Sequence, residues 1–364
     1  MVFRWLLLLI PLSLALTYFA HATPLVQFIV AVAAIVPLAE WIRRATDELA
    51  RTLGSAIGGL LNVTFGNVAE LLLAVFVLLD GHSDVVKGQI TGSIIGNGLL
   101  GLGLATVAGA WGREKQTFNR ASAGRLSSLL ILSVIALLLP ALFHLTERAA
   151  TGPNTTRHLD ERLSLGVSVV LLVVYAANLV YTLVTHRDVF ATAEEDEAST
   201  KEHDTHARPL PPVWRSLTVL LAGTAFVAWE AEIVSGALTA TATTLGVTIF
   251  FLGVIVLAVI GNSSEYLAAV YYARKNQMSM AMSITVGSSI QVALLVAPLL
   301  VILSYFLGKP MNLVFASPLE LIAIASVAFS VNAIAQDGET TWFEGVLLLA
   351  VYALFVLAFY FVVP

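Results

Sequence analysis

Residues 66–76 read GNVAELLLAVF, and residues 261–271 read GNSSEYLAAVY. Each stretch opens with Gly-Asn and places a glutamate, Glu70 or Glu265, inside a largely apolar run. A charged carboxylate at the centre of a bilayer costs about 3 kcal/mol, and acids inside membrane segments usually mark ion or substrate pathways. The paired motif therefore predicts two functional acids in a membrane-embedded fold.

The composition supports a membrane location. Of the 364 residues, 58% are hydrophobic and 12% are charged, whereas soluble domains are about half apolar and about a quarter charged. The chain has no cysteine, which excludes disulfides, thiolate metal sites and cysteine nucleophiles. No basic stretch carries interleaved aromatic residues, so the sequence does not predict a nucleic-acid partner.

Apolar runs long enough to cross a bilayer, about 20 residues each, define the fold class. We predict an all-α membrane protein with about 11 transmembrane helices. The predicted spans are 4–20, 24–42, 53–80, 84–110, 122–144, 163–186, 213–237, 241–273, 278–307, 313–334 and 343–363. Four of them are rich in Gly, Ser, Thr and Asn, which predicts broken helices around a polar cavity: 53–80, 84–110, 241–273 and 278–307.

Segment 1–22 has a second interpretation. Arg4, a leucine-rich run and the sequence Ala20-His21-Ala22 fit a cleaved signal peptide. Because another apolar span follows at once, we favour a retained first transmembrane helix.

The distribution of positive charge orients the chain. Most of its 19 Lys and Arg residues fall in loops on the same side as the N-terminus, and such loops face the cytoplasm. We therefore expect an integral protein of the lipid bilayer, in a prokaryotic cytoplasmic membrane, with its N-terminus inside and its C-terminus outside.

Residues 188–212, DVFATAEEDEASTKEHDTHARPLPP, are acidic and end in prolines. This composition is typical of a flexible, solvated segment. We expect a cytoplasmic linker between two five-helix repeats, 23–187 and 213–364. The alternative is a cation-attracting or regulatory segment, in which His203 and His206 respond to pH.

The two Gly-Asn motifs belong to an internal repeat. The offset that relates Glu70 to Glu265 also relates Ser93 to Ser288. An odd number of predicted spans separates the matching positions, so the two halves would cross the membrane in opposite directions. Inverted repeats with broken helices at the midplane are the architecture of many secondary transporters, which bind their substrate between the halves.

The motif side chains can form an all-oxygen cation site. Glu70, Glu265, Asn67 and Asn262 supply carboxylate and amide oxygens, which suit Ca²⁺ better than the tighter octahedron that Mg²⁺ demands. Transition metals prefer His or Cys ligands. In a second interpretation, Asn67 and Asn262 are N-cap residues of helices that begin inside the membrane.

Two buried carboxyl groups also bind protons. Burial and a like-charged neighbour favour the neutral form of a carboxyl group, and a bound divalent cation displaces the protons. If only the proton-loaded and cation-loaded sites move between the two sides, the protein is an antiporter.

Further polar residues follow each motif. Four of them could ligate the ion, hold the glutamates or relay protons: Ser93, Asn97, Ser288 and Gln291. Small and amide side chains also pack helices together, and this alternative stays open. Glu40 and Glu232 are expected near opposite membrane edges, where they are gating candidates. Glu320 and Glu344 have no counterpart in the first half and receive no role.

Residues 66–103 and 261–298 resemble the two α-repeats of the cation/proton exchanger family, part of the calcium:cation antiporter superfamily. The closing stretch 337–361, DGETTWFEGVLLLAVYALFVLAFYF, is similar to the tail of that family. The resemblance implies the same set of spans, the acidic cytoplasmic linker and Ca²⁺/H⁺ exchange, with essential carboxylates at Glu70 and Glu265. It also implies that the following residues lie nearby: Asn67, Asn262, Ser93, Asn97, Ser288 and Gln291.

Four positions distinguish this chain within the superfamily. The family often has His where Tyr266 stands and Ser where Gly96 stands. Sodium/calcium exchangers usually have Pro before the glutamate, where this chain has Ala69 and Ser264. The absence of proline at these two positions favours protons over sodium as the coupling ion.

The leading hypothesis is a secondary transporter that exchanges Ca²⁺ for H⁺ by alternating access and requires no cofactor. A Na⁺/Ca²⁺ exchanger, or an antiporter for Na⁺, K⁺ or Mn²⁺, is the closest alternative, and a passive channel is another. An intramembrane enzyme with a glutamate acid or base agrees less well with the repeat, and the sequence has no nucleophile or HExxH motif.

Overall fold

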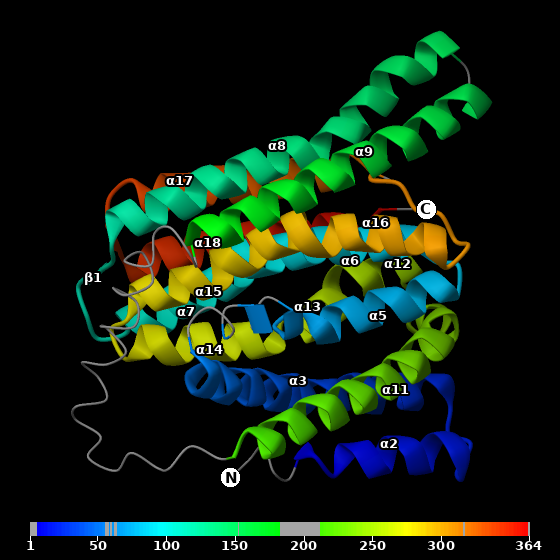
Figure 1. The fold of residues 1–364 in the computed structure, drawn as a ribbon, viewed down its shortest axis with the longest axis horizontal. Coiled ribbons are helices and arrows are strands. Elements are labelled where there is room, and N and C mark those ends of the chain that lie inside the picture. Colours follow the sequence, from blue (N-terminus) through cyan, green and yellow to red (C-terminus); the bar gives the residue numbers. More distant parts are fainter. Residues whose placement is uncertain are drawn as a thin grey trace.

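In the computed structural model, the protein is a bundle of long, roughly parallel helices (Figure 1). The structure describes residues 6–54, 58, 60–61, 64–151, 153–182, 212–315 and 317–362. The predicted linker 188–212, with His203 and His206, lies outside the described residues apart from Pro212.

The first half of the described chain is almost entirely helical. Its helices are α2 (Leu9–Tyr18), α3 (Pro24–Leu53), α5 (Val68–Leu79), α6 (Ser83–Ile95), α7 (Leu102–Ala110), α8 (Arg120–Thr151) and α9 (Pro153–Val180). A π-helical segment, η1 (Gly96–Gly101), joins α6 to α7 without a break in the helix.

The second half repeats this character. Its helices are α11 (Val213–Leu245), α12 (Ile249–Phe251), α13 (Ala258–Gly261), α14 (Ser263–Arg274), α15 (Met278–Gln291), α16 (Ala297–Phe306), α17 (Pro318–Ala335) and α18 (Trp342–Tyr360). The π-helical segments are η3 (Leu252–Leu257) and η4 (Val292–Val296). Two short strands, β1 (Gln116–Thr117) and β2 (Glu339–Thr340), pair antiparallel and connect the loop after α7 to the loop before α18.

Eight helices of the described chain are long and apolar enough to cross a membrane, and the count becomes nine if the bent pair 249–261 and 263–274 is one span. Two shorter apolar helices, α2 and α5, lie within the predicted first and third spans. The prediction of an all-helical membrane protein is thus confirmed, whereas the full number of spans stays a prediction.

Local sequence explains several helix boundaries. α17 and α18 both begin with a capping box, in which Glu320 accepts a hydrogen bond from the backbone of Ser317, and Glu344 accepts one from the backbone of Thr341. α11 is followed by the cap residue Gly246, whose φ of 68° is left-handed, a conformation that glycine adopts without strain. The two acids to which the sequence assigns no role therefore close helix ends.

The two halves are interleaved. α3 packs along α11, α6 packs on η3, and α7 packs on α14, so each of these contacts joins one half to the other. Gly92 permits the close approach of α6, because an added Cβ atom would lie 1.8 Å from the carbonyl oxygen of Val254 in η3. Helices α8, α9 and α17 cover one side of the bundle, and α2 lies at the opposite side (Figure 1).

Polar contacts attach the first helix to the second half. Ser13 on α2 donates a 2.7 Å hydrogen bond to the carboxylate of Glu230 on α11, and both residues are buried. Beside them, the indole of Trp229 donates a 3.0 Å bond to the hydroxyl of Tyr18. Hydrogen bonds between helices inside a membrane protein stabilise their association, so α2 is a packed part of this bundle.

The helices are interrupted at the two Gly-Asn motifs, as the sequence predicts. α5 begins at Val68, directly after a turn at 66–67, and the helices on either side of Asn262 are bent by 52°. The other two predicted breaks, in 84–110 and 278–307, are not observed, because the chain stays helical through η1 and η4. A π-helical turn accommodates an extra residue within a helix and is frequent at functional sites.

Candidate ion site

The two Gly-Asn motifs meet inside the bundle. Glu70 lies in the first turn of α5, and Gly261 is the last residue of α13. A Cβ atom added at Gly261 would lie 3.3 Å from the Cβ atom of Glu70, so the two segments touch. Equivalent stretches of the sequence repeat thus lie against each other.

Asn67 binds the other half of the chain. Its Nδ2 atom donates a 2.6 Å hydrogen bond to Oε1 of Gln291 on α15, and Ser288 makes a longer contact of 3.5 Å to its Oδ1 atom. Its side chain makes no cap bond to α5, and the side chain of Asn262 makes none to α14. Both asparagines do occupy the N-cap positions of α5 and α14, as this interpretation predicts, but their side chains bond across the halves instead of capping the helices.

Asn262 also bonds to the other half of the chain. Its Nδ2 atom donates a 2.9 Å bond to Ser93 on α6, and its Oδ1 atom accepts a 2.8 Å bond from Asn97 in η1. Asn97 also donates to Ser288, at 3.1 Å. The structure thus brings together both motif asparagines and all four polar residues that the sequence selects after the motifs.

The carboxyl group of Glu70 is deeply buried. It is 1% exposed, and neither carboxylate oxygen accepts a hydrogen bond from a residue that the structure describes. Gln89 donates instead to the backbone carbonyl of Glu70, at 3.0 Å. A buried charge without a partner is strongly unfavourable, so this carboxyl group requires a cation or a proton.

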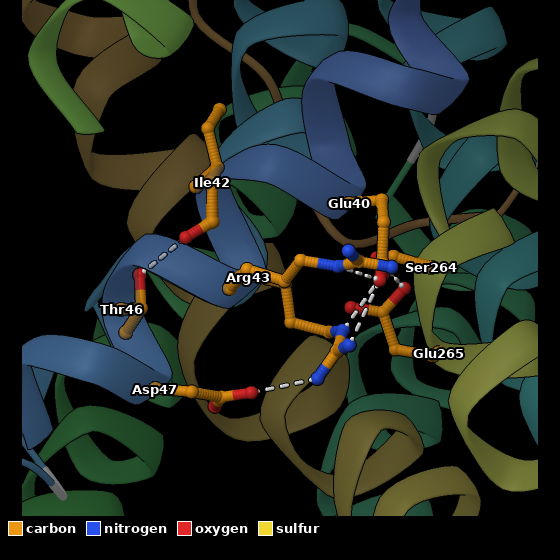
Figure 2. A network of polar contacts seen from close by, with 8 residues as sticks. Glu40, Ile42, Arg43, Thr46, Asp47, Ser264 and Glu265 are labelled. Atoms are coloured by element: carbon orange, nitrogen blue, oxygen red, sulfur yellow. Dashed lines mark hydrogen bonds and ion pairs between the residues drawn. The ribbon is translucent and has the colours of Figure 1, made fainter. Parts of the chain in front are cut away.

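Glu265 occupies the equivalent place in α14. It is 9% exposed and accepts a 2.9 Å hydrogen bond from Ser264 (Figure 2). The charges of Glu70 and Glu265 act on each other. Within the described ranges, no group of three or more His, Cys, Asp and Glu side chains forms a metal site. A cation held here would complete its coordination with amide, hydroxyl, carbonyl or water oxygens, as Ca²⁺ does.

A cluster of ion pairs lies beside Glu265, and Glu40 is its one member among the predicted site residues. Arg43 on α3 forms ion pairs of 2.9 Å with Glu40 and 2.7 Å with Asp47, and Arg44 pairs with Glu40 at 2.6 Å. Figure 2 shows Glu265 next to these side chains, and the charges of Arg43 and Glu265 act on each other. The three- and four-residue spacing of the cluster is the sequence signal for ion pairs on a helix face.

The two gating candidates do not occupy equivalent places. Glu40 is 5% exposed and lies beside Glu265 (Figure 2). Glu232 is exposed on α11. The ion pairs of Glu40 with Arg43 and Arg44 compensate the burial of its carboxylate, and its position near a membrane edge stays a prediction.

Gly96 and Tyr266, two positions at which this chain differs from the cation/proton exchanger family, are in contact. A Cβ atom added at Gly96 would lie 2.3 Å from the hydroxyl oxygen of Tyr266. Tyr266 is 6% exposed and follows Glu265 on α14. The tyrosine therefore fills space that a side chain at position 96 would need.

Comparison with known proteins finds chains that are similar to this one over most of its length. The model of a family described as sodium/calcium exchanger protein matches residues 23–184 and 215–361. A Ca(2+)/H(+) antiporter of Synechocystis sp. is 42% identical, with 99% of this chain and 97% of that protein covered. The Ca(2+)/H(+) antiporter ChaA of Bacillus subtilis is 38% identical over 93% of each chain. Among solved structures, the selenium-substituted Ca2+/H+ antiporter YfkE is 33% identical, with 99% of each chain covered and a TM-score of 0.83.

Proposed function

The chain belongs to the sodium/calcium exchanger protein family, and on this premise we propose that it is a secondary transporter that exchanges Ca²⁺ for H⁺ by alternating access. The two antiporter relatives are similar over almost its whole length. The observation that carries the proposal is the buried carboxylate of Glu70, which lies where the two motifs touch and has no hydrogen-bond partner among the described residues. This family membership supports ion transport rather than an enzymatic reaction.

The proposed architecture has about eleven transmembrane helices. They form a first helix, 1–22, and two inverted five-helix repeats, 23–187 and 213–364, joined by the acidic linker 188–212. The helices long enough to span, together with the shorter α2 and α5, support this number. The family match in two segments supports the division. The N-terminus lies in the cytoplasm of a prokaryotic cell, and the C-terminus lies outside.

In the cation-loaded state, Glu70 and Glu265 supply charged oxygens to Ca²⁺, and Asn67 and Asn262 supply amide oxygens. The long 3.5 Å contact from Ser288 leaves Oδ1 of Asn67 able to coordinate a cation. Water and backbone carbonyls complete a shell of about six to eight oxygens. The residues that hold the two asparagines by hydrogen bonds are positioning residues: Ser93, Asn97, Ser288 and Gln291.

In the proton-loaded state, protons neutralise the same carboxyl groups. The burial of Glu70 makes an empty, doubly ionised site unfavourable. Two compensated states remain, one with Ca²⁺ and one with protons, and these are the states in which the site changes sides. Each movement of Ca²⁺ in one direction therefore requires a movement of protons in the other.

Glu40 is a gating residue in this proposal. Arg43 lies close enough to Glu265 for their charges to interact, so it competes with Ca²⁺ for that carboxylate unless its own partners retain it. Glu40 and Asp47 are those partners. Glu232, the second gating candidate, lies on α11, which packs along α3.

Purified protein in liposomes tests the proposal. An imposed pH gradient should drive uptake of radioactive Ca²⁺, and Ca²⁺ added to the protein in weak buffer should release protons. Gradients of Na⁺, K⁺ or Mn²⁺ presented in the same assay identify any other coupling ion. If no pH gradient of either direction moves Ca²⁺, the proposed function is wrong.

A further inference from the structure

Tyr266 fills a glycine-lined space beside the ion site. A Cβ atom added at Gly96 would lie 2.3 Å from its hydroxyl oxygen, and one added at Gly101 would lie 2.7 Å from its ring atom Cδ1. Both glycines belong to η1. The tyrosine therefore occupies volume that longer side chains of this segment would otherwise take.

The hydroxyl group of Tyr266 is unsatisfied. The residue is 6% exposed, and its Oη atom makes no hydrogen bond to a described residue. A buried hydroxyl without a partner is destabilising, whereas a phenylalanine ring would fill the same space without that loss. The hydroxyl therefore points to a polar partner that enters the site.

Other unsatisfied oxygens belong to the same region. Asn97 follows Gly96, and its Oδ1 atom is buried without a described partner, as are both carboxylate oxygens of Glu70. The charges of Glu265 and Glu70 also act on Tyr266. A buried water needs about two to four polar partners. These atoms offer such partners next to the place where the cation is expected.

We propose that the Tyr266 hydroxyl binds a water molecule that is at the same time a ligand of the transported Ca²⁺; this inference rests on the proposed function. A water that coordinates a cation turns its oxygen toward the ion and its hydrogens outward. It therefore donates a hydrogen bond to the phenolic oxygen. Tyr266 is then a positioning residue that contributes to cation affinity through this water.

Tyr266→Phe removes the hydroxyl and keeps the ring against Gly96 and Gly101. We expect the dissociation constant for Ca²⁺, measured with radioactive Ca²⁺ on purified protein in detergent, to rise about threefold to tenfold, the effect of one hydrogen bond. The Tm should not fall. The matched control is Tyr175→Phe, because Tyr175 on α9 also has a buried hydroxyl without a described partner. This control should leave the dissociation constant unchanged.

Gly96→Ala tests the contact itself. Its methyl group would overlap the Tyr266 hydroxyl, so this variant should have a lowered Tm. When it is combined with Tyr266→Phe, the nearest atom of that ring is Cζ, at 3.6 Å, which is an ordinary contact. The Tm should then recover, while the affinity for Ca²⁺ stays as low as in Tyr266→Phe.

An unchanged dissociation constant in Tyr266→Phe, or an equal rise in Tyr175→Phe, would overturn the water-mediated role. A double variant that does not recover its Tm would overturn the assignment of the hydroxyl to this space. The proposed function fails by a different result, namely that the unaltered protein neither binds Ca²⁺ nor exchanges it for H⁺.

Discussion

Asn67 and Gln291 stand in opposite halves of the chain, and Nδ2 of the asparagine donates a 2.6 Å hydrogen bond to Oε1 of the glutamine. The bond connects the start of α5 to the end of α15. Because the donor end of the Asn67 amide is committed to Gln291, its oxygen is directed to the remaining space, where a cation can reach it. One hydrogen bond thus sets the orientation of a proposed ligand.

Gln291→Ala should release the Asn67 amide and raise the KM for Ca²⁺ about fivefold, which corresponds to about 1 kcal/mol for one hydrogen bond. Asn67→Ala removes the same pair, so the double variant should be no worse than Asn67→Ala alone. Ca²⁺ uptake into liposomes measures each KM. Gln336→Ala, at an exposed position after α17, is the control. Fully additive losses would contradict the coupling of the two residues.

Glu70→Gln keeps the size of the side chain and removes its charge. Exchange should be abolished, because a neutral amide cannot alternate between protons and Ca²⁺. The free energy of unfolding should not fall, since the carboxylate oxygens have no described hydrogen bond to lose. Uptake and Tm, measured on the same preparation, check both parts.

Glu344→Ala is the control for Glu70→Gln, because it should reduce stability and leave exchange intact. It removes the 2.6 Å capping bond from the backbone of Thr341 and should lower stability by about 1 kcal/mol while exchange persists. If the Glu70→Gln variant still exchanges Ca²⁺ for H⁺, the assignment of Glu70 to the ion site is wrong.

Glu40→Gln should free Arg43 to pair with Glu265 and compete with the cation. We expect the KM for Ca²⁺ to rise about tenfold, because an opposite charge next to a carboxylate stabilises its ionised form by about that factor or more. A second substitution, Arg43→Gln, should restore the affinity, because it removes the competing charge. If Glu40→Gln alone leaves the KM unchanged, Glu40 does not control Arg43.

Ser13→Ala should destabilise the protein through Glu230. The serine donates to one carboxylate oxygen of Glu230, and the other oxygen is already buried without a described partner. The loss should be about 1–3 kcal/mol, and Glu230→Met in the same protein should recover part of it by removing the buried acid. Thermal unfolding in detergent measures the change. Ser326→Ala, at a half-buried position on α17, serves as the control; an equal loss there would contradict a specific role for Ser13.

Hydropathy was sufficient to predict the helical class, because a segment exposed to lipid must be long, apolar and internally hydrogen-bonded. It did not predict that 84–110 and 278–307 remain helical. Glycine and small polar residues permit both a broken helix and a π-helical turn, and packing decides between them. In η1 the glycines pack closely against Tyr266 and Val327, both from helices of the other half.

The internal repeat singled out Glu70 and Glu265, and their burial agrees with that selection. The repeat could not indicate which residues each asparagine faces, because a sequence displays local spacing and not contacts between halves. Asn67 therefore fits an N-cap in sequence, although its side chain bonds Gln291. The signal of the Arg43 cluster was present in its helical spacing, but its place beside Glu265 depends on how α3 packs.

α6 packs on η3, and Asn67 bonds to Gln291, so the proposed site contains residues from both halves. Neither half can form this site alone. Since the ribosome delivers the N-terminal half first, that half must reside in the bilayer with an unsatisfied acid until α15 has been synthesised and inserted. Completion of the site is therefore a late event of biogenesis. Fragments 1–187 and 213–364, translated from separate messages, should become active only where both are inserted into the same membrane.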